Sequence, residues 1–244
     1  MPSRIGALTI MVDIHCHILP AIDDDGPSRL EDVLEMARIA VADHIRQIVA
    51  TPHIKNKIHS PDLIRERVAW FNQELKKKGI DLEILPGAEV SSILNTSIMR
   101  EHTLNGTDYL LLEFPHSHLP QNARQIVFDA LMAGMIPIIP HPERNPTVVR
   151  RPELLFDLVE AGALVQVTAE SLVGGFGPEA RACAAYLLKN DVVHALATDA
   201  HSPTWRRTIL SGGVREAAKI IGESAALRLV TTNPAAIIAG KTLG

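Results

Sequence analysis

The chain has few cysteines and few aromatic residues, and both shortages exclude classes of protein. Only two cysteines occur in 244 residues, too few for a disulfide framework, so we expect a cytoplasmic protein in a reducing compartment. Aromatic side chains make up 4% of the chain. This leaves little material for the base stacking on which single-stranded nucleic-acid binding depends.

Basic tracts and long apolar runs are also missing. The formal net charge is −4, so we expect no nucleic-acid partner and no nuclease activity. No run approaches the ~20 apolar residues that a membrane-spanning helix needs, so we expect no membrane insertion. The segment 1–10 has no long apolar core, so we expect no signal peptide. Met11 lies directly before Val12-Asp13-Ile14-His15, and translation beginning there would still leave a strand that leads into this segment. We therefore interpret residues 1–10 as a dispensable extension.

Short β-branched runs alternate with longer amphipathic stretches, a pattern typical of repeated βα units around a parallel sheet. We predict strands at Thr9–His15, Arg46–Thr51, Leu82–Ala88, Tyr109–Glu113, Ile136–Pro140, Leu164–Thr168 and Val193–Thr198. We predict helices at Leu30–Asp43, Pro61–Lys78, Ser92–His102, Gln121–Met132, Pro152–Ala161, Gly177–Lys189, Arg206–Ile221, Ala225–Val230 and Pro234–Ala239. The length fits one α/β barrel, so we expect 1–244 to form a single domain.

Two histidines close the first predicted strand. His15 and His17 are two residues apart, so on an extended strand both side chains point to the same face and can reach one metal ion. Ile14 and Cys16 then point the other way. A His-x-His pair alone is a weak signal, and its weight depends on the rest of the chain.

Metal-capable side chains also follow the later predicted strands, at the end where each strand finishes. They are His53, Glu89, Glu113, His141, Asp199 and His201. In a βα barrel these positions meet on one face, where active sites are built. Imidazoles and carboxylates without thiolates suit Mn²⁺, Fe²⁺, Zn²⁺ or Mg²⁺. So many ligands indicate two or three neighbouring ions, which can activate water and stabilise phosphoryl transfer.

These motifs resemble the polymerase-and-histidinol-phosphatase (PHP) family from about Met11 to Pro234. The motifs are His15-x-His17, Thr51-Pro52-His53, Gly87-Ala88-Glu89, Leu112-Glu113-Phe114, His141-Pro142-Glu143-Arg144 and Thr198-Asp199-Ala200-His201. The stretch Asp13–Pro20, with Asp-Gly-Pro soon after, is similar to the bacterial manganese-dependent protein-tyrosine phosphatases of capsule and exopolysaccharide operons.

The resemblance implies a distorted (β/α)7 TIM-like barrel of the PHP type with two or three divalent ions. Mn²⁺ is the ion that the family favours, with Fe, Zn or Mg as alternatives. The implied ligands are His15, His17, Asp24, His53, Glu89, Glu113, His141, Asp199 and His201. Arg144 would bind the substrate phosphate, and Arg206 is a second candidate. A planar guanidinium can make two parallel hydrogen bonds to a phosphate.

One ligand position stays ambiguous, because this chain has three aspartates before Gly26 where the family pattern has two. Counting from His17 selects Asp24, whereas counting back from Gly26 selects Asp25. We favour Asp24.

The resemblance further implies hydrolysis of phosphotyrosine by a metal-bridging hydroxide, with His53 or a metal-bound water supplying a proton. Family context suggests the tail of a bacterial tyrosine kinase as substrate, and hence control of polysaccharide export. Two alternatives stay open: a small-molecule phosphatase such as a histidinol-phosphatase, and a non-catalytic metal-binding module. The oligomeric state is undetermined.

The cysteines and a second His-x-His pair do not point to further catalytic residues. A cysteine phosphatase loop, Cys-x5-Arg, would need Arg at position 22 or 189, where the chain has Ile22 and Lys189. We therefore expect Cys16 to be a packing residue. His116 and His118 follow Glu113 in a proline-flanked loop, which we expect to face solvent or substrate.

Overall fold

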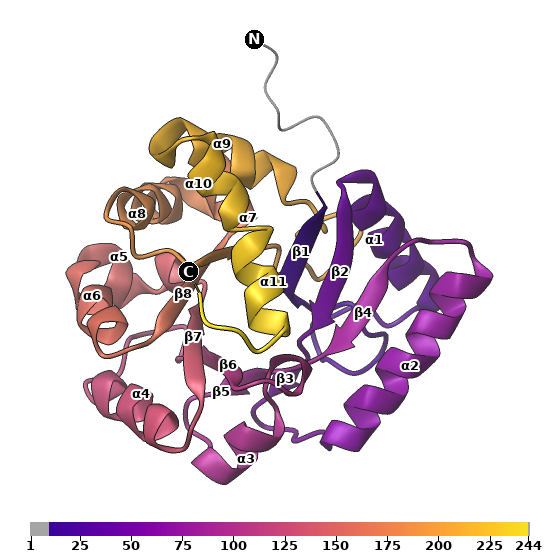
Figure 1. Ribbon diagram of the computed structural model, residues 1–244, viewed down its shortest axis with the longest axis horizontal. Coiled ribbons are helices and arrows are strands. Elements are labelled where there is room, and N and C mark those ends of the chain that lie inside the picture. The colour runs from indigo at the N-terminus through magenta and orange to yellow at the C-terminus, as the bar shows by residue number, and fades with distance from the viewer. Residues whose placement is uncertain (1–9, 244) are drawn as a thin grey trace.

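A ring of parallel strands surrounded by helices forms the body of the molecule (Figure 1). The computed structural model describes residues 10–243. The strands are β1 Met11–Cys16, β2 Ile45–Ala50, β3 His53–Ile54, β4 Glu83–Pro86, β5 Glu89–Ser91, β6 Tyr109–Glu113, β7 Ile136–Pro140, β8 Leu164–Thr168 and β9 Ala195–Ala197. The α-helices are α1 Leu30–Ala42, α2 Pro61–Lys77, α3 Thr96–Glu101, α4 Ala123–Met132, α5 Pro146–Arg150, α6 Glu153–Glu160, α7 Ala169–Val173, α8 Gly177–Lys189, α9 Ser211–Ile221, α10 Glu223–Arg228 and α11 Thr232–Ile238.

Two of the predicted strands are followed at once by a further short strand that was not predicted. After β2 the strand pairing breaks at Thr51-Pro52, where Pro52 has no backbone N–H to give to a ladder, and β3 follows. After β4 it breaks at Gly87-Ala88, and β5 follows. As a result the strands form two hydrogen-bonded sheets. One has three strands in the order β1-β2-β4, and the other has six strands in the order β3-β5-β6-β7-β8-β9. Both breaks lie just before the predicted ligands His53 and Glu89.

The ring is joined at one end and opened at the other. Where β1 and β9 finish, the His17 amide donates to the Ala200 carbonyl (2.9 Å) and the Asp199 amide donates to the His15 carbonyl (2.8 Å). Where they begin, the Val12 amide instead donates to Val230 in the C-terminal segment. The predicted distorted (β/α)7 barrel is confirmed, and this insertion is one source of its distortion.

Helix α11 covers the end of the barrel at which the strands begin (Figure 1). Its Ile237 and Ile238 belong to the same buried cluster as Ile14 of β1. The hydroxyl of Tyr109, the first residue of β6, donates to the carbonyl of Lys241 just past α11 (2.7 Å). The opposite end, where the strands finish, is left for the polar residues.

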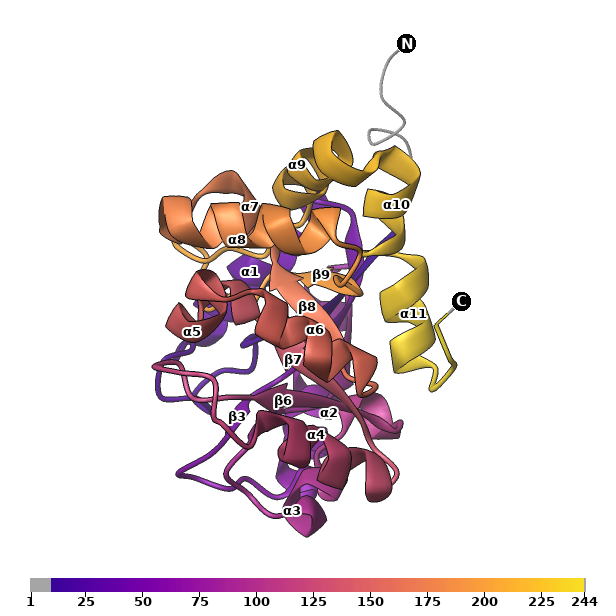
Figure 2. The same cartoon turned by 90° about the vertical axis from the view of Figure 1, so that its left-hand side faces the viewer.

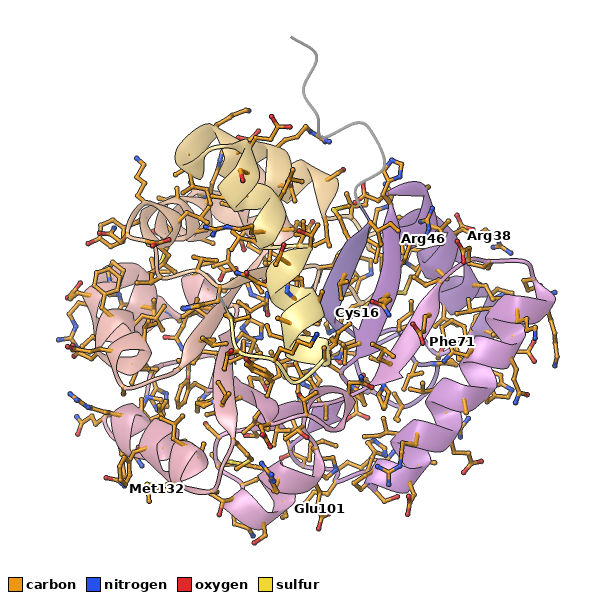
Figure 3. The ribbon with its side chains drawn as sticks, in the orientation of Figure 1. Cys16, Arg38, Arg46, Phe71, Glu101 and Met132 are labelled. Atoms are coloured by element: carbon orange, nitrogen blue, oxygen red, sulfur yellow. The ribbon has the colours of Figure 1, made fainter. Side chains whose placement is uncertain are left out.

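The outer helices lie around the strands (Figure 2), and α2 buries an apolar face that includes Phe71, labelled in Figure 3. Phe71 of α2 is fully buried. Its neighbour Asn72 donates from Nδ2 to the Ile84 carbonyl (2.8 Å) and accepts from the Ile84 amide at Oδ1 (2.9 Å). This side chain satisfies backbone groups of β4, which pairs only with β2 within residues 10–243.

Most of the predicted elements are present, and the clearest error concerns the helix predicted at Arg206–Ile221. Strands β6, β7 and β8 and helix α8 have the predicted bounds, but α9 begins only at Ser211. Arg206 has φ +48°, a left-handed conformation that no α-helix can include. Helices α5 and α7 were not predicted. No helix in the described part of the chain is long and apolar enough to cross a membrane. The proposed extension lies outside the described residues except for Ile10.

Candidate metal centre

The polar residues predicted to follow the strands do meet at one end of the barrel. Eight of the nine predicted ligands take part in four groups whose nitrogen and oxygen ligand atoms lie within 4.8 Å of one another. The groups are His17, Asp25, His53 and His201; His15, His17 and Asp199; His15, Glu89 and His141; and His53, Glu89 and Glu113. Because the groups share members, the ions they could hold would be close neighbours.

The His15 and His17 imidazoles converge on one point. Their Nε2 atoms are 3.2 Å apart. Each Nδ1 has a carbonyl or carboxylate acceptor, Gln166 Oε1 for His15 (2.8 Å) and Asp23 Oδ2 for His17 (3.1 Å). An Nδ1–H directed at these oxygens leaves both Nε2 lone pairs free. Two nitrogens bound at ~2.1 Å to one ion would be separated by about this distance, so the pair fits a metal.

Gln166 is a functional candidate that the sequence analysis missed. It lies on β8, the strand to which we assigned no ligand, and is fully buried. The signal available in the sequence was a polar residue inside the apolar run Leu164–Val167. We expect Gln166→Leu to weaken metal binding about 10- to 100-fold, because it releases the His15 ring from its orientation. Titration of metal-free protein with Mn²⁺ would measure this, with Gln125→Leu on the exposed face of α4 as the control; equal affinities would contradict it.

Glu89 contacts four histidines through its two carboxylate oxygens. Its Oε2 lies 3.4 Å from Nε2 of both His15 and His17 and 3.0 Å from Nδ1 of His53. Its Oε1 lies 2.8 Å from Nε2 of His141. Burial alone would raise the pKa of this carboxyl, but His15 and the other imidazoles hold it well below the usual value. Glu89 is therefore an anion whose two oxygens face different groups of ligands.

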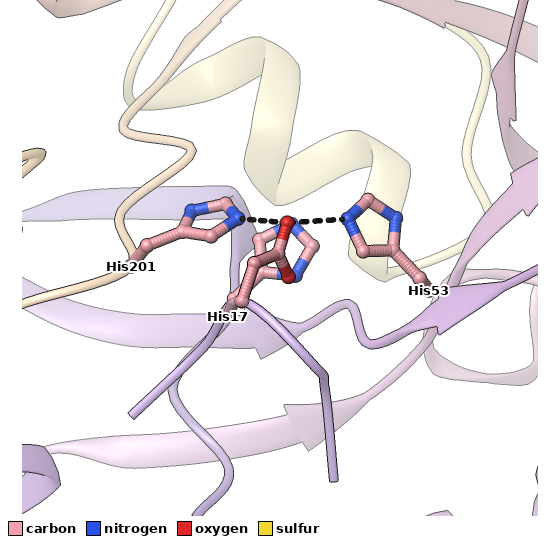
Figure 4. A group of neighbouring side chains, drawn as sticks. His17, His53 and His201 are labelled. Carbon is pink, nitrogen blue, oxygen red and sulfur yellow. Dashed lines mark ion pairs between the residues drawn. The ribbon is translucent and has the colours of Figure 1, made fainter. Parts of the chain in front are cut away.

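Asp25, and not the favoured Asp24, lies at the histidines. One Asp25 oxygen is 3.5 Å from Nε2 of His53 and 3.7 Å from Nε2 of His201. Figure 4 shows these two ion pairs together with His17. Both aspartates are exposed, but Asp24 belongs to none of the four groups. The geometry therefore favours Asp25 over Asp24 as the candidate ligand.

Asp23 fixes the position of the loop that carries Asp25. Its Oδ1 accepts a hydrogen bond from the His53 amide (2.7 Å), while its Oδ2 faces the His17 ring. These contacts tie the loop down at Asp23 and leave Asp25 to face His53 and His201. Asp23 is a supporting residue that the sequence analysis did not identify.

Both predicted phosphate-binding arginines contact Asp199. Nη2 of Arg144 and Nη2 of Arg206 each lie 2.5 Å from Asp199 Oδ2. The other oxygen, Oδ1, lies 3.2 Å from Nε2 of His15. The Phe176 ring lies beneath the guanidinium carbons, 4.6 Å from that of Arg144 and 5.7 Å from that of Arg206. The two cations are thus held beside the ligand atoms.

Three residues of the centre have left-handed backbone conformations that non-glycine residues seldom adopt. The φ angles are +38° at His141, +49° at Asp199 and +48° at Arg206. Each such residue costs about 1–3 kcal/mol, and such strain concentrates at functional sites. Fold stability would be served better by glycine or asparagine at these turns, so we attribute the present residues to a function.

The histidines of the centre differ in how readily they take up a proton. Burial opposes protonation of His53, but Asp25 and Glu89 raise its pKa to about 9. Burial and Arg144 lower the pKa of His141 to about 4, and burial and His17 lower that of His201 to about 4. At neutral pH the centre thus contains anionic carboxylates at Glu89 and Asp199, neutral imidazoles at His141 and His201, and a protonated imidazole at His53. Divalent ions would supply the same positive charge.

Cys16 and the loop histidines His116 and His118 lie outside the four ligand groups. Cys16 is fully buried, and burial raises the pKa of its thiol well above the usual value. It is therefore a packing residue, as predicted. His116 is exposed at the edge of the centre, with its Nε2 2.9 Å from Glu113 Oε1. His118 is exposed as well.

Comparison with known proteins identifies the family. The model of the family described as "Capsular polysaccharide synthesis, CpsB/CapC" matches residues 11–239. The chain belongs to this CpsB/CapC family. One relative is the tyrosine-protein phosphatase YwqE of Bacillus subtilis, which is 43% identical over 79% of this chain and 78% of the relative. The putative tyrosine-protein phosphatase CapC of Staphylococcus aureus is 36% identical over 82% of this chain and 80% of the relative.

Solved structures agree with this placement of the chain in the CpsB/CapC family. A structure from a study of YwqE from Bacillus subtilis and CpsB from Streptococcus pneumoniae, described as unique metal-dependent tyrosine phosphatases, aligns with a TM-score of 0.90. It is 38% identical, and 96% of each chain is covered. A histidinol phosphate phosphatase from Lactococcus lactis aligns with a TM-score of 0.51 at 16% identity, covering 88% of this chain and 93% of that chain, and it shows a shared fold only.

Proposed function

We propose that this CpsB/CapC member is a metal-dependent phosphatase that hydrolyses phosphotyrosine in proteins. The observation that carries the proposal is the convergence of the four ligand groups with Arg144 and Arg206 at one end of the barrel. The named activities of the relatives support it, since YwqE is 43% identical. The small-molecule alternative is supported only by the similarity in fold to histidinol phosphate phosphatase.

We assign two or three divalent ions to the centre, with Mn²⁺ as the ion expected. The proposed ligands are His15, His17, Asp25, His53, Glu89, Glu113, His141, Asp199 and His201. Such ions lower the pKa of bound water and stabilise charge on phosphoryl oxygens. A degenerate, non-catalytic module is disfavoured because a full set of donors is present and mutually close.

The protein's own groups then have distinct tasks. Gln166 and Asp23 orient the His15 and His17 rings through Nδ1. Arg144 and Arg206 bind the equatorial oxygens of the phosphate, where negative charge has to be stabilised in the transition state. His53 has carboxylates near both ring nitrogens, so we assign it to metal binding. Its role as a proton donor stays a prediction, and tyrosinate needs little help as a leaving group.

The physiological substrate that we propose is a tyrosine-phosphorylated protein of capsule synthesis, with the tail of a bacterial tyrosine kinase as the leading candidate. The family description and the names of the relatives support the biological setting. The cytoplasm is the corresponding location, and the low cysteine content agrees with it.

Substrate comparison tests the proposal. We expect purified protein with added Mn²⁺ to hydrolyse a phosphotyrosyl peptide with a kcat/KM at least about tenfold above that for histidinol phosphate or phosphoserine. The reason is that an aryl oxyanion leaves readily, whereas an alkoxide depends far more on protonation by a general acid. Faster turnover of histidinol phosphate would transfer the assignment to the small-molecule alternative.

A further inference from the structure

A large cavity lies directly beside the metal centre. Its volume is about 800 Å³, within the range of sites that bind organic ligands. Helices α5 and α8, which lie next to each other (Figure 2), supply most of its walls. Val149, Ala180, Cys183 and Tyr186 contribute apolar surface, and Arg150 contributes charge. None of these five residues belongs to the ligand groups.

The cavity and the metal centre share a wall. Arg144 lines the cavity and also contacts Asp199 through Nη2. Phe176 lines the cavity as well, and its ring lies 4.6 Å from the Arg144 guanidinium carbon. Arg144 and Phe176 therefore border both spaces, so the residues next to a phosphotyrosine held at Arg144 would lie close to the cavity.

The lining contains a buried polar group without a partner. Glu143 is fully buried and lines the cavity. Its Oε1 accepts hydrogen bonds from the Thr168 amide and the Ser171 hydroxyl, but its Oε2 has no partner among the described protein atoms. A buried acceptor left without a donor is costly. Because Oε2 is itself buried, Glu143 belongs to the wall of the cavity and offers no open contact to a ligand.

Other walls are held in place before any ligand arrives. The exposed Tyr186 ring stacks on Phe156 with centroids 6.1 Å apart and an interplanar angle of 7°. Pro146 and Pro152 add rigid apolar surface at the ends of α5. The charges in the lining are balanced, with Arg144 and Arg150 against Glu143 and Glu179. This chemistry suits an extended peptide with apolar side chains better than a second anion.

We propose that this cavity binds the polypeptide residues that flank the phosphotyrosine of the substrate. The inference rests on the proposed phosphatase function and adds a specificity site to it. The flank gives affinity and no chemistry, so small aryl phosphates should not depend on it. Loss of such uniform binding raises KM and leaves kcat unchanged.

The test fills the cavity with a large side chain. Ala182 of α8 is exposed and lines the cavity, so Ala182→Trp should obstruct it without disturbing the core. We expect kcat/KM for a phosphotyrosyl peptide with apolar flanking residues to fall about tenfold through KM. The kcat/KM for p-nitrophenyl phosphate should stay within twofold, which also shows that the variant is folded. The matched control is Ala69→Trp, an exposed alanine on α2.

A second variant removes a wall in place of filling the space. Tyr186→Ala should raise KM for the peptide and leave turnover of p-nitrophenyl phosphate unchanged. Equal effects on both substrates, or no effect of either variant on the peptide, would overturn the inference. Absence of phosphotyrosine turnover in the unmodified protein would instead overturn the proposed function, so the two failures are distinguishable.

Discussion

Removal of divalent ions is expected to abolish hydrolysis of phosphotyrosyl peptide, and added Mn²⁺ is expected to restore it. Cys16, which lies between His15 and His17 in the sequence, is buried and has a raised thiol pKa, so we assign it no nucleophilic role. The polar atoms that converge at this end of the barrel are those of the candidate ligands, with the Arg144 and Arg206 guanidinium groups beside them. Without ions the carboxylates would repel a phosphate, which the same site attracts when ions are bound. Chelator titration with an activity readout measures the effect.

A variant that removes one ligand separates loss of metal from other actions of a chelator. Asp199→Asn keeps the shape of the side chain but removes its charge, which faces His15 on one side and both arginines on the other. We expect kcat to fall at least about a hundredfold, with metal content per chain reduced. The control is Asp62→Asn, a highly exposed aspartate on α2. Full activity after chelation would refute the metal mechanism.

The convergence of the candidate ligands could be predicted from the sequence because it follows from one rule. Side chains just past parallel strands converge, and His15, His53 and Glu89 could be placed by that rule without knowing any contact. The short strands β3 and β5, which begin at His53 and Glu89, could not be foreseen, because two or three residues have no periodicity that distinguishes a strand from a loop. The convergence survives because each break comes before the ligand and not after it.

Other features depend on contacts between residues far apart in the sequence, and no local pattern announces them. Gln166 faces the His15 ring across 151 positions of the chain. Arg206 was predicted to begin a helix because an apolar periodicity follows it. In the structure its guanidinium reaches back to Asp199, and the left-handed conformation at this residue replaces the expected helical turn.

Asp199 links the two halves of the proposed chemistry. Its Oδ1 faces the histidines, and its Oδ2 accepts from both arginines. Binding of a phosphate would give the guanidinium groups a second anion to contact. The arginines are therefore held close to their point of use before substrate arrives, which reduces the entropy lost on ordering them. Phe176 contributes to this order by lying against both.

Asp25→Asn and Asp24→Asn form a matched pair of neighbouring substitutions with very different expected results. We expect the Asp25 variant to lose at least about a hundredfold in kcat/KM for p-nitrophenyl phosphate, because a carboxylate shared by His53 and His201 is removed. The Asp24 variant should stay within twofold, since that side chain is exposed and outside the ligand groups.

Metal analysis beside the kinetics makes the comparison decisive. If Asp25 completes an ion site, its variant should bind less metal, and high Mn²⁺ should recover part of the lost activity. The opposite ranking of the two variants would return the ligand to Asp24. It would also mean that the loop changes register when metal binds, in which case the contacts of Asp23 with the His53 amide and the His17 ring would have to break. Because those contacts also orient His17, we expect them to hold.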